Sequence, residues 1–91
     1  MKKEIECRIT GKVQMVMFRD FIQQKARSLG ITGTVENMDD RSVRVVAQGA
    51  EDALETFIEH LHKGPFLAHV ARVESEKREP TEMFSNFRII Y

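Results

Sequence analysis

The fold is decided near the start of the chain, where residues 4–30 read EIECRITGKVQMVMFRDFIQQKARSLG. Apolar and charged residues alternate over 4–9, which predicts a half-buried strand with Glu4 among its outward-facing residues. Beginning at Phe18, apolar residues recur at helical spacing, and Gly30 stands where a left-handed residue would end a helix. This change of period predicts a strand, a loop and a helix in succession.

The rest of the chain supplies the other elements of a small sandwich. Val70 and Val73 cannot share one face of a regular strand, so that segment is irregular, and a bulge is one explanation. The predicted strands are Ile31–Glu36, Ser42–Gln48, Ala68–Ser75 and a short Phe87–Tyr91, and a second helix runs from Glu51 to Gly64-Pro65. The order βαββαβ, with a short extra strand at its end, predicts an α+β fold. We expect a ferredoxin-like sandwich with two helices on one face of a mainly antiparallel sheet.

Length and composition favour one globular domain, residues 1–91, since 42% of the residues are hydrophobic and 31% are charged. The 14 Lys and Arg residues balance the 14 Asp and Glu residues, which argues against a nucleic-acid or membrane-surface partner. The strand over 42–48 also lacks the aromatic residues with which RNA-binding modules of this topology stack bases. Cys7 is the only cysteine, so an internal disulfide and a cysteine-based zinc site are excluded. We expect a cytoplasmic monomer without metal or cofactor.

The loop between the first strand and the first helix is the first candidate site. It reads Gly-Lys-Val-Gln-Met-Val-Met-Phe-Arg over residues 11–19. Successive main-chain N–H groups in such a loop can converge on an anion, which the helix N-terminus also favours. The planar guanidinium of Arg19 can bind two oxygens of a phosphate at once. Taken alone, the spacing favours an ordinary loop that carries a solvated arginine.

Asn37 is the second candidate, at the end of the second predicted strand. A carboxamide both donates and accepts hydrogen bonds, so it can orient a water molecule beside an electrophile. Asparagine is also a common turn residue because it bonds its own backbone and tolerates left-handed conformations. Its position alone therefore leaves a structural and a functional role open.

Together these stretches carry a resemblance to the acylphosphatase family that extends over essentially the whole chain. The family's loop pattern, Gly-x-Val-Gln-Gly-Val-x-Phe-Arg, is met by residues 11–19 at every defined position except Met15, where the family has glycine. The pattern Gly-x-Val-x-Asn is met by residues 33–37, and Asn-Phe-x-Ile-x-Tyr by residues 86–91. Three matches in the same order make the resemblance specific, and the family shares the βαββαβ arrangement.

The resemblance implies hydrolysis of a small-molecule acyl phosphate to a carboxylate and inorganic phosphate, without a metal. It implies that Asn37 positions the attacking water and that Arg19 binds the phosphoryl oxygens. A phosphate or sulfate anion would also be held by the loop amides of Gln14, Met15, Val16, Met17, Phe18 and Arg19. Methionine at position 15 would be strained if the family glycine adopts a positive φ, or would crowd the phosphate. The alternative is therefore a weakly active or inactive relative that binds phosphate or a partner protein.

Overall fold

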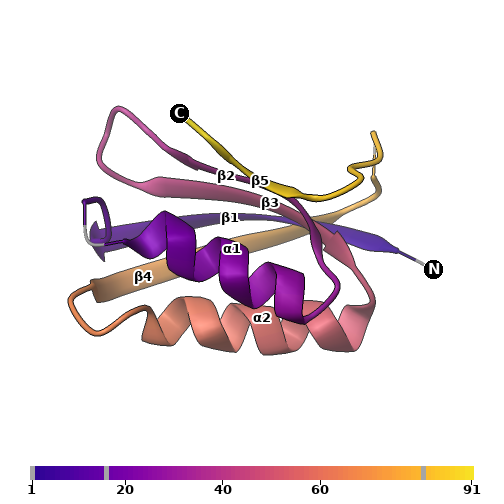
Figure 1. Cartoon of the computed structure of the whole chain (residues 1–91), viewed down its shortest axis with the longest axis horizontal. Coiled ribbons are helices and arrows are strands. Elements are labelled where there is room, and N and C mark those ends of the chain that lie inside the picture. The colour runs from indigo at the N-terminus through magenta and orange to yellow at the C-terminus, as the bar shows by residue number, and fades with distance from the viewer. Residues whose placement is uncertain (1, 16, 81) are drawn as a thin grey trace.

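The computed structural model describes residues 2–15, 17–80 and 82–91 (Figure 1). Its helices and strands follow the predicted order closely, with ends that differ by a few residues. The elements are β1 (Lys3–Lys12), α1 (Phe18–Ser28), β2 (Thr32–Asn37), β3 (Val43–Gly49), α2 (Glu51–Lys63), β4 (His69–Arg78) and β5 (Phe87–Ile90). Gly30 has a φ of 70°, which is the left-handed conformation expected just beyond the first helix.

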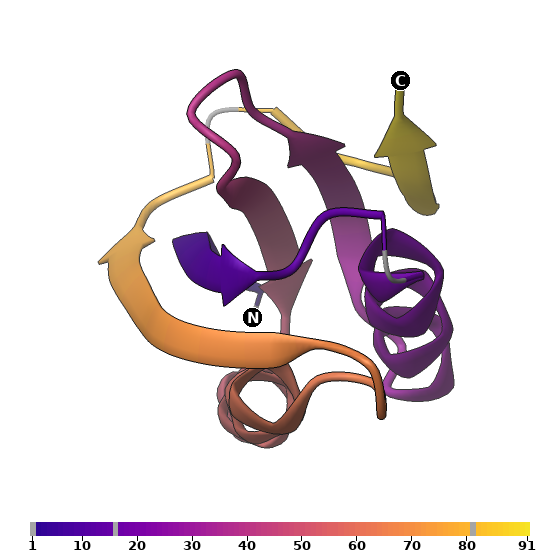
Figure 2. The ribbon, with the colours of Figure 1, turned by 90° about the vertical axis from the view of Figure 1, so that its left-hand side faces the viewer.

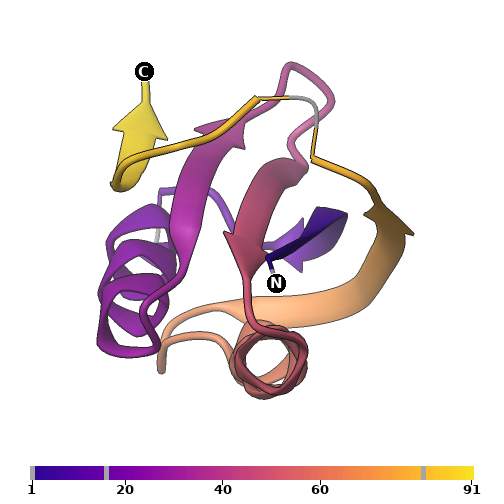
Figure 3. The same cartoon turned by 90° about the vertical axis from the view of Figure 1, so that its right-hand side faces the viewer.

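The five strands form one mixed sheet in the order β4-β1-β3-β2-β5. The neighbours β4, β1, β3 and β2 pair antiparallel, whereas β5 runs parallel to β2. Figures 2 and 3 show both helices on the same face of this twisted sheet. The predicted ferredoxin-like α+β sandwich is therefore confirmed, and the short final strand forms the edge beside β2.

The hydrophobic core lies between the helices and that face of the sheet. β1 contributes its alternating apolar residues, including Cys7, and the helices contribute their apolar stripes. The rings of Phe57 and Phe87 meet edge to face with centroids 6.1 Å apart, so α2 and β5 share one core although they lie far apart in sequence. Burial raises the pKa of the Cys7 thiol to about 12, which suits a core residue and not a nucleophile.

The predicted irregularity between Val70 and Val73 is confirmed as a bulge. On β1, Thr10 pairs with Arg72 and the next residue, Gly11, pairs with Val70, so β4 carries one extra residue there. Gly11 has a φ of 123°, and a Cβ atom on it would lie 2.2 Å from the carbonyl oxygen of His69. Only glycine fits at this position of the bulge, directly before the β1–α1 connection.

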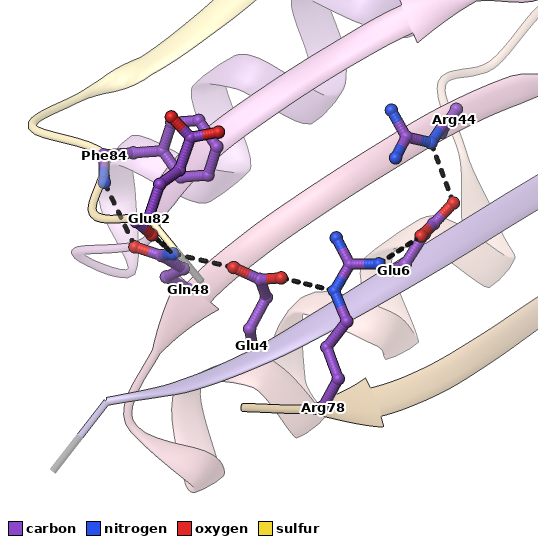
Figure 4. Close-up of polar contacts among 7 residues, drawn as sticks. All are labelled: Glu4, Glu6, Arg44, Gln48, Arg78, Glu82 and Phe84. Carbon is purple, nitrogen blue, oxygen red and sulfur yellow. Dashed lines mark hydrogen bonds and ion pairs between the residues drawn. The ribbon is translucent and has the colours of Figure 1, made fainter. Parts of the chain in front are cut away.

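The prediction that Glu4 faces solvent was wrong, because its side chain is buried on the other face of the sheet. Its carboxylate accepts hydrogen bonds from Gln48 and Arg78, as Figure 4 shows. Gln48 also bonds the main chain of Glu82 and Phe84, in the connection between β4 and β5. This connection crosses the sheet above Glu4 and removes it from water. The ion pair with Arg78 also explains why β4 continues beyond the predicted end at Ser75.

None of the helices formed by the described residues is long and apolar enough to cross a membrane.

Candidate active site

The connection between β1 and α1 wraps around the start of the helix. Val13 is buried and fixes one end of the connection in the core. Met15 and Met17 have φ values of 61° and 62°, in the left-handed region. Such turns rotate successive N–H groups toward a common point, as in anion-binding nests. Met17 is the N-cap residue of α1 and makes no side-chain capping bond. The Met17 side chain therefore does not accept a hydrogen bond from the N–H groups at the start of the helix.

The loop amides are available to a ligand. Within the described part of the chain, no residue accepts a hydrogen bond from the main-chain N–H of Met15, Met17, Phe18 or Arg19. The first N–H groups of a helix have no acceptor inside it, and they carry the positive end of the helix dipole. Val16, which was also predicted as an amide donor, lies outside the described residues. The arrangement suits an anion with several oxygens.

The Gln14 side chain ties this loop to the turn between β2 and β3. Its Nε2 donates hydrogen bonds of 2.9 Å to the carbonyl oxygens of both Met38 and Ser42. Sequence reasoning treated Gln14 only as a main-chain donor and missed this contact. A side-chain bond to two residues more than twenty positions away leaves no periodic signal, so the local pattern could not have indicated it.

Asn37 is the last residue of β2 and pairs with Val43 of β3, directly before that turn. Its Oδ1 is buried and has no hydrogen-bond partner among the described residues. A buried carbonyl oxygen without a donor is unfavourable. A ligand or water that donates a hydrogen bond to this oxygen would therefore be favoured.

Arg19 and Asn37 line the same small pocket, whose volume is about 70 Å³. Figure 1 shows how this arises, because the β1–α1 connection, the β2–β3 turn and the end of β5 lie at the same end of the sheet. Figure 2 looks onto that end. The pocket is lined by Val13, Met15, Met17, Phe18, Arg19, Asp20, Asn37, Ile89 and Tyr91. The two predicted site residues are thus brought together, as a shared substrate requires.

Sequence reasoning did not place Asp20, Ile89 and Tyr91 at the site. Asp20 follows Arg19 on the first turn of α1, and its carboxylate gives the pocket one negative charge. The Tyr91 ring lies over the guanidinium of Arg19, with 4.9 Å between the guanidinium carbon and the ring centroid. The closing Asn-Phe-x-Ile-x-Tyr pattern was a signal for Ile89 and Tyr91. Their position became evident only from the parallel pairing of β5 with β2.

Methionine in place of the family glycine at position 15 was expected either to strain the backbone or to crowd the phosphate. The positive φ of Met15 distinguishes these two consequences. The residue adopts the conformation in which glycine is favoured. Its side chain is 97% exposed and extends into solvent at the mouth of the pocket. Backbone strain is therefore the consequence of this methionine, and its side chain does not fill the phosphate-sized space.

Comparison with known proteins agrees with the fold and with the family resemblance. A model of the acylphosphatase family matches residues 5–89. The chain is 44% identical to an acylphosphatase of Salinibacter ruber, over 97% of this chain and 93% of the relative. It is 46% identical to one of Lactobacillus johnsonii, over 98% and 99% of the two chains. The crystal structure of acylphosphatase from Bacillus subtilis superposes with a TM-score of 0.95 at 32% identity, over 100% of both chains. The chain belongs to the acylphosphatase family.

Proposed function

We propose that this protein hydrolyses acyl phosphates, releasing a carboxylate and inorganic phosphate. The observation that carries the proposal is the shared pocket of Arg19 and Asn37 at the uncapped start of α1. A water oxygen forms a bond to phosphorus while the bond from phosphorus to the acyl oxygen breaks. The electron pair of that bond leaves with the carboxylate, and the two protons of the water pass to phosphate oxygens and solvent.

The phosphoryl group binds between Arg19 and the amides of the loop in this proposal. Arg19 neutralises charge on the phosphoryl oxygens, and the amides of Gln14 to Arg19 contact the same oxygens. The transition state of phosphoryl transfer is loose and spreads charge over these oxygens, so fixed donors stabilise it without a change of position. The carboxylate leaving group has a conjugate acid with a pKa of about 4, and needs no metal to assist its departure. We therefore expect the reaction to be metal-independent.

Asn37 positions the attacking water. Its carboxamide lines the pocket beside Arg19 and holds that water by hydrogen bonding. It thereby holds the lone pair of the water toward phosphorus, opposite the leaving carboxylate. A weak nucleophile suffices because the acyl phosphate is already activated. Catalysis then comes mainly from orientation and charge stabilisation.

The test is hydrolysis of a synthetic aryl acyl phosphate with chelator present. We expect activity that survives the chelator and falls at least about 100-fold in both Arg19→Gln and Asn37→Ala. Arg72→Gln is the matched control for charge, because Arg72 is an exposed arginine of β4. Thr32→Val is the control for Asn37, because Thr32 Oγ1 is also a buried oxygen without a hydrogen-bond partner among the described residues and lies at the opposite end of β2. Equal losses in test and control variants would overturn the assignment, and dependence on a metal would overturn the metal-free step.

The weakly active or inactive alternative is not favoured. The relatives named above are acylphosphatases that align along nearly their full length with this chain. We further propose that residues 1–91 act as a single monomeric domain in the cytoplasm, with no macromolecular partner required for hydrolysis. Light scattering at assay concentration checks the monomer, and cell fractionation checks the location.

A further inference from the structure

Three large apolar side chains surround the mouth of the pocket and are exposed to water. Met15 is 97% exposed, Met17 is 72% exposed and Tyr91 is 92% exposed, and all three line the pocket that contains Arg19 and Asn37. We call these three residues the rim. Exposed apolar side chains are unremarkable singly, but a group around a polar pocket marks a binding surface.

The backbone and one ring contact hold the rim in place. Met15 and Met17 both adopt left-handed φ values within the short β1–α1 connection, which directs their side chains away from the core. The Tyr91 ring lies over the Arg19 guanidinium. Methionine adapts to ligands of different shape because its thioether is flexible and polarizable. The rim therefore combines a fixed ring with two adaptable side chains.

The size of the pocket determines what the rim contacts. About 70 Å³ is far below the several hundred Å³ of sites that enclose a whole organic ligand. The pocket admits the phosphoryl end of a substrate, and the remainder must lie outside it. Whatever is attached to the phosphoryl group therefore extends across Met15, Met17 or Tyr91.

We propose that the rim binds the acyl group and makes the enzyme selective for acyl phosphates with apolar acyl chains. This inference rests on the proposed function, since it concerns the same pocket. Acetyl phosphate gains little from the rim, whereas longer chains bury additional methylene groups against it. A fully buried methylene favours binding about fourfold. Because the rim is open to solvent and buries each methylene only in part, we expect the affinity to rise about twofold for each methylene, up to chains of six carbons.

The experiment measures two quantities across matched chain lengths. One is the Kd for ethyl-, butyl- and hexylphosphonate, which do not undergo hydrolysis. The other is kcat/KM for acetyl, butanoyl and hexanoyl phosphate, whose leaving groups are similarly acidic. The test variant is the double substitution Met15→Gln with Met17→Gln, which preserves side-chain length and backbone strain but removes the apolar surface. The control is Met83→Gln, because Met83 is 65% exposed and does not line the pocket.

We expect affinity and kcat/KM to rise with chain length in the natural protein and in Met83→Gln. In the double variant the dependence on length should flatten, and this is judged from the ratio of hexanoyl to acetyl phosphate hydrolysis within each protein, whatever the rate on acetyl phosphate. If hydrolysis depends on chain length equally in the natural protein and in the double variant, the proposed role of the rim is overturned, and the proposed function stands. If alkylphosphonate affinity rises with length without any hydrolysis, the rim is supported and the proposed function fails. Equal affinity for all three phosphonates in the natural protein overturns the rim regardless of activity.

Discussion

The side-chain amide of Gln14 donates a hydrogen bond of 2.9 Å to the main-chain carbonyl oxygen of Met38. The contact joins the loop before Arg19 to the residue directly after Asn37. A second bond from the same Nε2 reaches Ser42, at the other end of the turn. The Gln14 side chain, which does not line the pocket, thus links the proposed phosphate-binding loop to the turn beside the proposed water-positioning residue.

Gln14→Ala should therefore lower kcat more than it raises KM. Loss of two half-buried hydrogen bonds should reduce the free energy of unfolding by about 1–2 kcal/mol. The displaced turn should reduce kcat about tenfold through Asn37. Gln23→Ala is a matched control, because Gln23 donates a half-buried bond to the carbonyl of Phe87 and does not line the pocket. Steady-state kinetics and urea unfolding of both variants check this, and an equal fall of kcat in Gln23→Ala would contradict the positioning role.

Met15→Gly should stabilise the fold. A non-glycine residue in the left-handed region carries about 1–2 kcal/mol of strain, offset in part by the greater chain entropy of glycine. We expect a net gain of about 0.5–1 kcal/mol and a higher Tm. Gly30→Ala is the reverse test and should lower the Tm through backbone strain alone, because Gly30 has a φ of 70° and an added Cβ would meet no neighbouring atom. Calorimetry measures both, and a lower Tm in Met15→Gly would contradict the strain argument.

Asp20→Asn should tighten the binding of phosphate. The carboxylate shares the pocket with Arg19 and repels any anion bound there. Removal of one exposed charge a few ångströms away is worth about 1 kcal/mol, or roughly fivefold in affinity. Competitive inhibition by inorganic phosphate measures the change at low salt and at 0.5 M salt, where we expect it to shrink because screening increases. Unchanged inhibition at low salt would show that Asp20 does not act on the bound anion.

Arg78→Gln should lower the free energy of unfolding by more than substitutions at exposed positions of the same strand. Arg78 pairs with Glu6 and with the buried carboxylate of Glu4, so its loss leaves a buried charge without its cation. We expect a loss of about 3 kcal/mol. Arg72→Gln removes an exposed ion pair with Glu74 on the same strand and should change stability by less than about 1 kcal/mol. Urea unfolding distinguishes the two, and equal effects would mean that the pairing of Glu4 contributes little.

The free energy of unfolding should also decrease at acid pH, because Glu6 becomes protonated. The hydrogen bond from Arg44 is the largest cause that holds the pKa of Glu6 below its ordinary value of 4.5, with further lowering from Arg78. Ionised Glu6 therefore stabilises the folded state above pH 4.5, and this contribution is lost as the pH falls through the lower folded pKa. Arg44→Gln should make the loss of stability below pH 4.5 less steep. Unfolding curves over this range measure it, and identical acid slopes in both proteins would exclude the contribution of this pair.

The sequence alone was sufficient for the element order, and it singled out Arg19 and Asn37 as the candidate site residues. Alternation over β1 and helical spacing over α1 are local properties, since each element buries one face against the same core. Even the irregularity of β4 was predictable, because Val70 and Val73 break the period of the strand. Arg19 and Asn37 stood out because each lies in a patterned stretch at the end of an element. That they share one pocket was implied only by the family resemblance, and the tertiary structure shows it.

Pairing between distant segments was not predictable in the same way. The parallel alignment of β5 with β2 brings Tyr91 over Arg19, and no local period specifies which strand β5 joins. Glu4 was misplaced for the same reason, because the chain that covers it arrives some eighty residues later, at Glu82 and Phe84. Local patterns in this protein determined which residues form helices and strands. Which residues enclose the pocket and which charge is buried depended on contacts between remote segments, because those contacts form only after the elements have assembled.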